Sequence, residues 1–158
     1  MKPSRATVIA LTLLALAPCG RAQSCAASAT TVAFGTYDPF APLPRDSTGS
    51  VSVNCAAHAT ALNLAYSVSL AAGGSGNVAA RTLTSGVHRL NYQLYTDPMR
   101  MVPWGDAAGG TSKVFGLLLL NLVLPVSDTH TVYGRIAAGQ TGVGAGSYTD
   151  TITVTVSY

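Results

Sequence analysis

Hydrophobic and polar residues alternate along much of the chain, most clearly in its last eight residues, "TITVTVSY". Ile152, Val154, Val156 and Tyr158 fall on one side of an extended strand there, and threonine and serine fall on the other. The same period of two predicts further short strands around 30–34, 50–55, 62–70, 81–85, 90–94 and 131–136. The segment 114–124 is strongly apolar but does not alternate.

Turn-forming clusters separate these segments, among them "AAGGSGN", "VPWGDAAGGTS" and "AAGQTGVGAG". No segment after the first 22 residues has the i, i+3, i+4, i+7 apolar spacing of a helix. About seven short strands joined by such turns are typical of a β-sandwich. Because 158 residues leave room for one domain, we expect a single all-β sandwich.

The first 22 residues are expected to be a secretory signal peptide. Lys2 and Arg5 precede an apolar run over 8–17, and Gly20, Arg21 and Ala22 form a small-x-small cleavage site. The run is too short to span a bilayer. The mature domain is therefore expected to comprise residues 23–158, and the protein is expected to be exported.

Removal of this segment changes the charge of the chain. Three of the nine basic residues leave with it, so six remain beside six aspartates and the mature chain is near neutral. No basic patch is left to favour nucleic-acid binding. With 48% hydrophobic and 9% charged residues, the chain is also not a disordered polar segment.

Two cysteines remain in the mature chain, Cys25 and Cys55. An even pair in an exported protein favours a disulfide, and two free buried thiols are the alternative. A loop of about 31 residues closed in this way would stabilise the fold by about 3–4 kcal/mol in the chain-entropy model.

The chain contains no recognisable catalytic or metal-binding motif. His58, His88 and His130 have none of the usual ligand spacings, so each is expected to be a lone surface histidine. "GGSGN" lacks the last glycine of the G-x-S-x-G nucleophile turn, and the six aspartates form no evident pair. We therefore expect neither an enzyme nor a cofactor or metal site.

The C-terminal strand poses a question, because no residue follows that could place another strand beside it. An exposed apolar strand edge promotes aggregation and is normally covered. A sandwich that lacks a strand would expose a groove leading into its core. An incoming strand that buried five side chains there would gain about 7–15 kcal/mol before ordering costs, which rivals the stability of a whole domain.

Five stretches carry a resemblance to a known family: "CAASATTVAFGTYDP", "STGSVSVNC", "RTLTSGVHRLNYQLYTDPMRMVPWGD", "TVYGRIAAGQ" and "GSYTDTITVTVSY". They resemble the spore coat protein U domain, the pilin-like module of archaic chaperone–usher pili. The resemblance extends from Cys25 to Tyr158. It implies an immunoglobulin-like, pilin-type sandwich that lacks its final strand, with the family's cysteine pair at Cys25 and Cys55.

The resemblance also implies a function. The protein would be an exported structural or adhesive subunit of a chaperone–usher pilus or surface coat, secreted through the periplasm to the cell surface. Its partners would be a periplasmic chaperone, an outer-membrane usher and neighbouring pilin subunits, which lend the missing strand by donor-strand complementation. The groove for that strand is expected to be flanked by Ile152, Val154, Val156 and Tyr158.

Two features depart from the family pattern. A donor strand needs about ten residues ahead of the first cysteine, at about 3.3 Å per residue, but cleavage after Ala22 would leave only Gln23 and Ser24. The protein would then accept a strand more readily than donate one, as a tip subunit or a member that polymerises differently.

The second departure is the apolar run "VFGLLLLNLVLPV". It predicts a strand buried on both faces, the hydrophobic crossing of a strand pair, or an exposed contact patch formed by Leu118, Leu120 and Leu122.

Two other classes of function remain open from the sequence. A small outer-membrane β-barrel would also end in an aromatic residue after alternating apolar positions, although aromatics make up only 7% of the chain. A carbohydrate-binding surface module could use Trp104 and Tyr95 as a stacking platform.

Overall fold

The computed structural model describes residues 24–56, 62–120 and 124–158. The predicted signal peptide, His58 and Leu122 lie outside these residues. Among the described residues, the regular elements are strands and one short 3-10 turn, η1 (Gly73–Ser75). The strands are β1 (Cys25–Ala29), β2 (Arg45–Cys55), β3 (Leu62–Leu70), β4 (Arg81–Ser85), β5 (His88–Tyr95), β6 (Val114–Leu120), β7 (Val126–Ile136) and β8 (Val154–Ser157).

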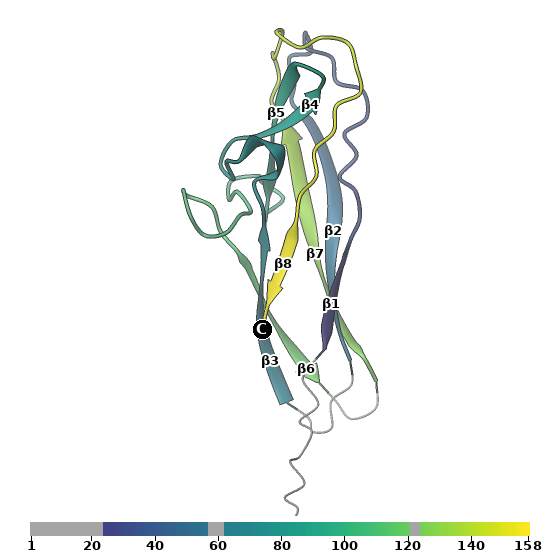
Figure 1. Cartoon of the computed structure of the whole chain (residues 1–158), viewed down its shortest axis with the longest axis vertical. Coiled ribbons are helices and arrows are strands. Elements are labelled where there is room, and N and C mark those ends of the chain that lie inside the picture. Colours follow the sequence, from purple (N-terminus) through teal and green to yellow (C-terminus); the bar gives the residue numbers. More distant parts are fainter. Residues whose placement is uncertain (1–23, 57–61, 121–123) are drawn as a thin grey trace, which may run out of the picture.

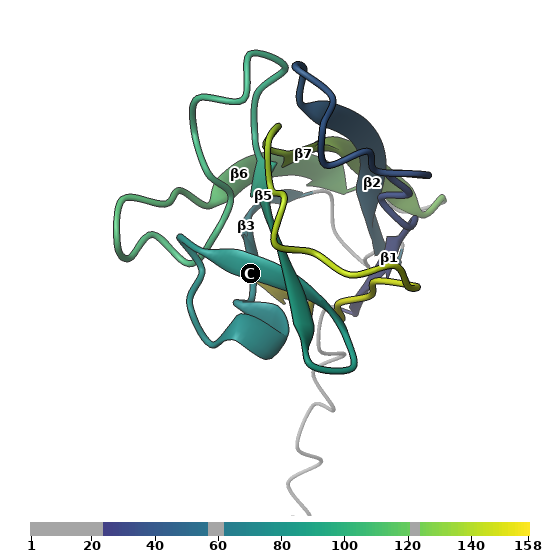
Figure 2. The ribbon, with the colours of Figure 1, turned by 90° about the horizontal axis from the view of Figure 1, so that it is seen from above.

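The strands form two sheets, and every pair within them is antiparallel. One sheet has the order β1-β2-β7-β5-β4 and the other the order β6-β3-β8 (Figures 1 and 2). The prediction of an all-β sandwich is confirmed. In the three-stranded sheet β3 is central, so β6 and β8 are its two edges.

Alternation of side chains builds the core between the sheets. Val51 and Val53 of β2, Tyr66 and Val68 of β3 and Leu94 of β5 are all buried, whereas most of their polar neighbours in sequence face outward. The other buried apolar side chains are Phe34, Cys55, Leu70, Leu90, Tyr92, Trp104, Leu118, Leu120, Val132 and Ile136.

The predicted disulfide is present. Cys25 and Cys55 face each other in the register of β1 and β2, with an S–S distance of 2.06 Å and a Cα–Cα distance of 4.0 Å. The bridge ties the beginning of β1 to the end of β2, and Cys55 is buried in the core.

Several predicted strands have different bounds in the structure, and β2 begins at Arg45 instead of 50. The first was expected over 30–34, but the ladder with β2 lies earlier, over Cys25–Ala29, and the chain leaves regular pairing after Thr30. β7 begins at Val126 instead of 131, because its N-terminal half continues the pairing with β2 as far as Cys55. No helix among the described residues is long and apolar enough to cross a membrane.

Candidate functional site

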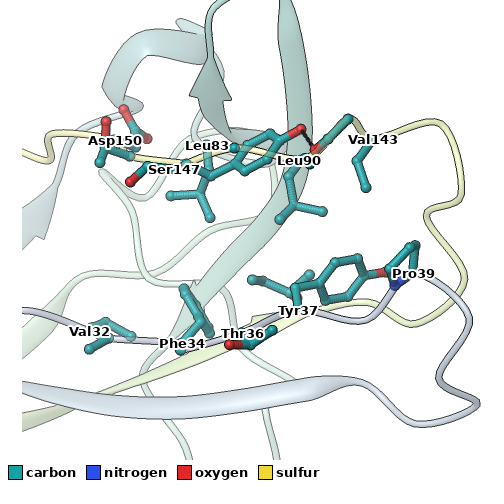
Figure 3. A pocket seen from close by; sticks show the side chains of 18 of the residues that line it. Val32, Phe34, Thr36, Tyr37, Pro39, Leu83, Leu90, Val143, Ser147 and Asp150 are labelled. Carbon is teal, nitrogen blue, oxygen red and sulfur yellow. Dashed lines mark hydrogen bonds between the residues drawn. The ribbon is translucent and has the colours of Figure 1, made fainter.

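A groove opens between two segments that lie more than 100 residues apart in the sequence. One wall is the chain that follows β1, over 29–39, and the other is the chain that leads into β8, over 143–154. The groove comprises two adjoining cavities of about 850 Å³ and about 300 Å³. In Figure 3, Val32, Phe34 and Tyr37 on the first wall lie across the larger cavity from Ser147 and Asp150 on the second.

The floor of the groove is the apolar core itself. Its lining residues include Leu83 and Leu90 of the β4–β5 hairpin and Ile136 of β7 in the larger cavity. Leu70 and Val132 line the smaller one. A ligand that fills the groove therefore meets side chains that otherwise pack between the sheets, which is the environment an additional core strand would require.

The first wall is held by side chains instead of a regular ladder. After the bond from the Thr30 N–H to the Ser50 carbonyl (2.9 Å), the Ser47 hydroxyl donates to the Ala33 carbonyl and the Arg45 Nε–H to the Phe34 carbonyl, each at 2.7 Å. The segment also passes so close to β2 that a Cβ on Gly49 would lie 2.8 Å from a methyl group of Val32. The wall is thus fixed to β2 although its own strand has ended.

The second wall is fixed by hydrogen bonds to β4, to β5 and to the chain that follows β3. Thr149 and Thr84 exchange two backbone hydrogen bonds of 3.1 and 2.9 Å, and the Ala71 N–H donates to the Thr153 carbonyl at 2.9 Å. The Asp150 carboxylate accepts from the Tyr92 hydroxyl (2.7 Å) and from the Gly74 N–H (2.9 Å). Burial and the adjacent Asp150 carboxylate raise the pKa of Tyr92, so its hydroxyl keeps its proton.

Asp150 is the one charged side chain that lines either cavity among the described residues. Its oxygens already accept hydrogen bonds from Tyr92, Gly74 and the Thr151 N–H. The carboxylate therefore serves to anchor the wall, and the remaining lining is apolar or uncharged.

The strand alternation fixes which backbone groups of β8 face the groove. Thr153 bonds toward β3, and backbone groups of successive strand residues point to opposite sides. The N–H and C=O groups of Val154 and Val156 consequently point to the open edge, where no partner for them lies in the described part of the chain. The edge of β8 is free for a further strand.

The four residues expected to flank the groove occupy different positions. Ile152 and Val154 line the smaller cavity, whereas Val156 packs against the core without lining either cavity. Tyr158 is 55% exposed, and its hydroxyl accepts a long bond of 3.4 Å from the Cys25 N–H. Val32 and Phe34 on the first wall also line the groove. The sequence does not indicate this role, because its alternation over 30–34 predicts a regularly paired strand.

The sequence matches the spore coat protein U domain over residues 11–155. The chain belongs to the spore coat protein U domain family. It is 37% identical to Protein U of Myxococcus xanthus over 136 residues, which cover 81% of this chain and 72% of that protein.

A solved structure is similar to the whole sandwich. It is the crystal structure of the CsuC–CsuE chaperone–tip adhesion subunit pre-assembly complex from the archaic chaperone–usher Csu pili of Acinetobacter baumannii. The TM-score is 0.55 and the identity 27%, and the match covers 87% of this chain but 40% of that one. This chain thus spans less than half of the length of the solved chain that it matches.

The contact patch expected from Leu118, Leu120 and Leu122 is wrong for its first two residues, and Leu122 lies outside the described residues. Leu118 and Leu120 are only 3% and 2% exposed and pack in the core. The alternating partners Leu117 and Leu119 are 59% and 63% exposed instead. The expectation of a strand buried on both faces is wrong for the same reason, because β6 covers the core with one apolar face and presents another to solvent.

The stacking platform expected at Trp104 and Tyr95 is also wrong. The Trp104 side chain is fully buried, and its Nε1–H donates to the Val68 carbonyl at 3.0 Å. A buried indole cannot stack on a sugar, so the carbohydrate-binding alternative loses its central residue.

A buried arginine, which sequence reasoning missed, supports the floor of the groove. Arg81 is fully buried, and its guanidinium donates to the carbonyls of Leu70 (3.1 Å), Ala71 (2.8 Å) and Trp104 (2.9 Å) and to the Gln93 side chain (2.5 Å). Burial lowers the pKa of Arg81 from its ordinary value, although the group remains a cation at neutral pH. The side chain joins β4, β5 and the end of β3 beneath the second wall.

His130 is not the lone surface histidine that was expected. It lies between the sheets, where its Nε2 is 2.7 Å from the hydroxyl of Tyr66, which is also 2.5 Å from a carboxylate oxygen of Asp128. Because the hydroxyl has one hydrogen to give to Asp128, His130 Nε2–H must donate to the hydroxyl oxygen. Burial and the Asp128 carboxylate raise the pKa of Tyr66. No group of three or more possible metal ligands occurs among the described residues.

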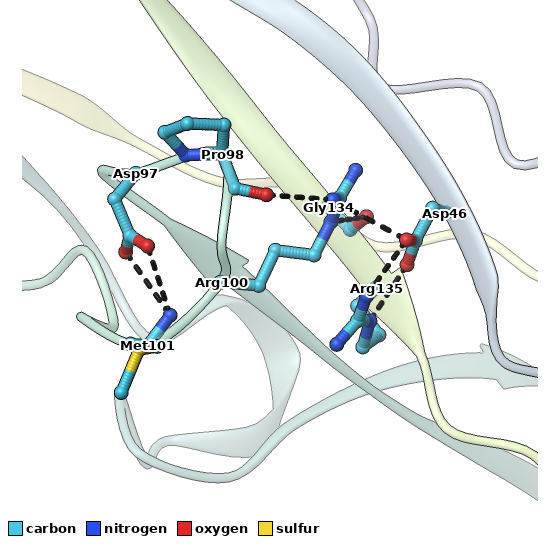
Figure 4. A network of polar contacts seen from close by, with 7 residues as sticks. All are labelled: Asp46, Asp97, Pro98, Arg100, Met101, Gly134 and Arg135. Carbon is cyan, nitrogen blue, oxygen red and sulfur yellow. Dashed lines mark hydrogen bonds and ion pairs between the residues drawn. The ribbon is translucent and has the colours of Figure 1, made fainter.

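The outer face of the larger sheet carries a separate polar network (Figure 4). Arg135 of β7 donates two hydrogen bonds of 2.7 and 2.8 Å to Asp46 of β2, and Arg100 approaches the same carboxylate at 3.3 Å. The hydrogen bond from Arg135 and the charge of Arg100 hold the pKa of Asp46 below its ordinary value. Neither arginine nor Asp46 lines the groove.

Proposed function

We propose that this chain is an exported structural subunit of a chaperone–usher pilus or a related surface coat, and that its groove accepts a β-strand from another polypeptide. The role is one of assembly and not of catalysis. The partners that fit it are a periplasmic chaperone, an outer-membrane usher and neighbouring subunits of the same kind. Membership of the spore coat protein U domain family and the likeness to a Csu pilus complex support this proposal.

The observation that carries the proposal is the groove with a free strand edge along it. The floor is core, and the open backbone groups of Val154 and Val156 run along one wall. An incoming strand would bond to these groups and place every second side chain on the floor. It would thereby supply at once the two things that an incomplete sandwich lacks, a ladder partner and core side chains.

The lining of the groove defines the chemistry of the occupant. All lining side chains other than Asp150 are uncharged, and the Asp150 carboxylate is already hydrogen-bonded within the chain. The occupant is therefore an extended segment with apolar side chains at alternate positions and no charge on that face. Its length follows from the first wall, which runs over 29–39, so a strand along the whole wall has up to about eleven residues at about 3.3 Å per residue.

The energetics agree with a subunit that depends on its partner. About five buried apolar side chains contribute about 7–15 kcal/mol before ordering costs. This is comparable to the full stability of an ordinary domain. The complemented protein should be very stable, and the protein without a partner should be short-lived.

The test uses two adjacent substitutions on β8 in the full chain, exported from cells that carry its neighbouring secretion genes. Val154→Asp places a charge on the half-buried groove side, and Thr155→Asp places the same charge on the exposed side. We expect Val154→Asp to abolish co-purification of any complementing chain, and Thr155→Asp to leave it unchanged. Mass analysis of the co-eluting protein identifies the donor.

A synthetic approach separates groove binding from loss of folding. The natural chain is refolded with and without a peptide of the donor segment identified by mass analysis, and thermal melting is recorded. Binding of the peptide should raise the melting temperature strongly, by mass action on the folded form. A protein that is monomeric without any donor and melts cooperatively at the same high temperature with or without peptide would refute the proposal.

A further inference from the structure

The other edge of the three-stranded sheet is also open, and it is apolar on its outer face. β6 pairs with β3 on one side only. Its outward side chains Phe115, Leu117 and Leu119 are 75%, 59% and 63% exposed. Exposed apolar stripes on an edge strand are rare in natural sheets, because such an edge is a template for another strand.

The register shows which backbone groups of β6 are free. Since Ala71 bonds toward β8, the even-numbered residues of β3 bond in the opposite direction, toward β6. Tyr66 and Leu64 lie opposite Gly116 and Leu118, so these residues of β6 bond to β3. The N–H and C=O groups of the alternate residues therefore point outward, and no partner for them occurs in the described part of the chain. They belong to Phe115, Leu117 and Leu119.

The same three residues thus present free backbone groups along the edge and apolar side chains on the outer face. We propose that two copies of this chain pair through β6 about a two-fold axis, as an antiparallel ladder centred on Leu117. In this register Leu117 lies opposite Leu117 of the second copy, and Phe115 lies opposite its Leu119. Two three-stranded sheets would join into one six-stranded sheet.

The chemistry of the edge favours a second copy as the occupant. In an antiparallel pair about a two-fold axis through Leu117, this residue faces its own copy, so a charge there would meet a like charge. The strand Val114–Leu120 has no charged residue, and every position that would meet another across the axis is apolar. The surface is complementary to itself without any rearrangement.

The size of the contact sets the expected strength. Three partly exposed side chains and one strand edge bury roughly a few hundred Å² per copy, which is below the ~800 Å² per partner of a standard interface. We therefore expect weak, concentration-dependent dimers that stop at two copies, because pairing uses up the edge. Within an assembled surface layer, where copies are concentrated, such a contact would be substantially occupied. The pairing does not use the groove and goes beyond the proposed strand acceptance.

The experiment measures self-association of the exported full chain, together with any chain that co-purifies. Sedimentation velocity is recorded over a wide range of protein concentration for the natural chain, for Leu117→Lys and for Thr48→Lys. Thr48 is exposed on β2 in the other sheet, so the control adds the same charge away from β6. We expect the natural chain and Thr48→Lys to dimerise alike, and Leu117→Lys to weaken dimerisation at least about tenfold, because like charges meet across the axis.

A cross-linking readout tests the register. In the proposed ladder the two Leu117 Cα atoms lie about 5.5 Å apart. A short thiol-to-thiol linker should join two copies of Leu117→Cys and not two copies of Thr48→Cys, with the Cys25–Cys55 bridge verified by mass. The proposal is overturned if the natural chain does not self-associate, if Leu117→Lys associates equally well, or if the Leu117 edge instead retains a different protein.

Discussion

The two edge strands of the three-stranded sheet, β8 and β6, both have unpaired backbone groups, but they differ in the burial of the side chains on the same residues. At β8 the residues with free backbone groups, Val154 and Val156, have partly buried side chains, and a groove lined by core residues lies alongside. At β6 the residues with free backbone groups have exposed side chains, and the core behind them is already closed by Leu118 and Leu120. An edge of the first kind completes a fold when it is paired, whereas an edge of the second kind joins two domains without adding to the core of either.

The largest expected effect in this comparison concerns the two faces of β6. Leu118→Ala should lower the free energy of unfolding by about 2–5 kcal/mol, because it removes a buried side chain and leaves a cavity. Leu117→Ala, one residue away, should change it by no more than about 0.5 kcal/mol. Urea denaturation of the purified variants measures both. Equal losses would mean that both faces of β6 are buried in the protein.

Removal of the disulfide tests whether β1 supports the first wall of the groove. Replacement of Cys25 and Cys55 by alanine should cost about 3–4 kcal/mol in the free energy of unfolding, because the unfolded chain regains the entropy of an open loop. The first wall of the groove continues directly from β1, which the bridge anchors, so the variant should also bind a complementing strand less tightly. Denaturation and donor affinity are measured on the same preparation. Loss of stability with unchanged donor affinity would show that the disulfide does not help to position the first wall of the groove.

A glycine tests how tightly β6 closes the core. A Cβ on Gly116 would lie 2.2 Å from the ring of Tyr66, whose hydroxyl is held by Asp128 and His130. Gly116→Ala should therefore cost about 1–3 kcal/mol through overpacking. Gly142→Ala is the matched control, because its Cβ would meet nothing within 4 Å. Thermal unfolding of the two variants gives the difference, and similar melting temperatures would contradict the packing described for β6.

The smallest expected effect lies away from both edges. The folded-state pKa of Asp46 is below its ordinary value of 3.8, so its ion pairs stabilise the protein at higher pH and are lost as the pH falls through the folded-state pKa. Asp46→Asn should cost at most about 1 kcal/mol at neutral pH, because the pairs are half exposed. It should also flatten the acid limb of the stability curve below about pH 4. Stability measured as a function of pH should show this change while donor binding and self-association stay as in the natural chain.

Much of the fold could be predicted from local pattern. Alternation located most strands, because side chains of successive residues in a strand must point to opposite faces. The even pair of cysteines, together with the expected export signal, indicated the bridge between Cys25 and Cys55. The alternation in "TITVTVSY" also identified the open edge at β8, and two of its four expected residues, Ile152 and Val154, line the groove.

The first wall of the groove could not be predicted in this way. Val32 and Phe34 follow the alternating pattern of a strand. Whether such a segment forms backbone hydrogen bonds with β2 depends on which groups of β2 lie beside it. The hydroxyl of Ser47 and the guanidinium of Arg45 take the place of backbone partners there. Arg81 gave no signal at all, because a buried arginine depends on carbonyl groups from three distant parts of the chain.

By itself the sequence determined that this protein is built from short strands and which positions share a strand face. Only the tertiary structure decided which apolar face of β6 is buried, that Trp104 is enclosed, and that residues 29–39 lie opposite 143–154. The physical reason is that alternation is set by the backbone of each residue and its neighbours. Burial instead depends on which other segments of the chain pack against a strand. In an apolar run such as "VFGLLLL", either face of the strand could be the buried one.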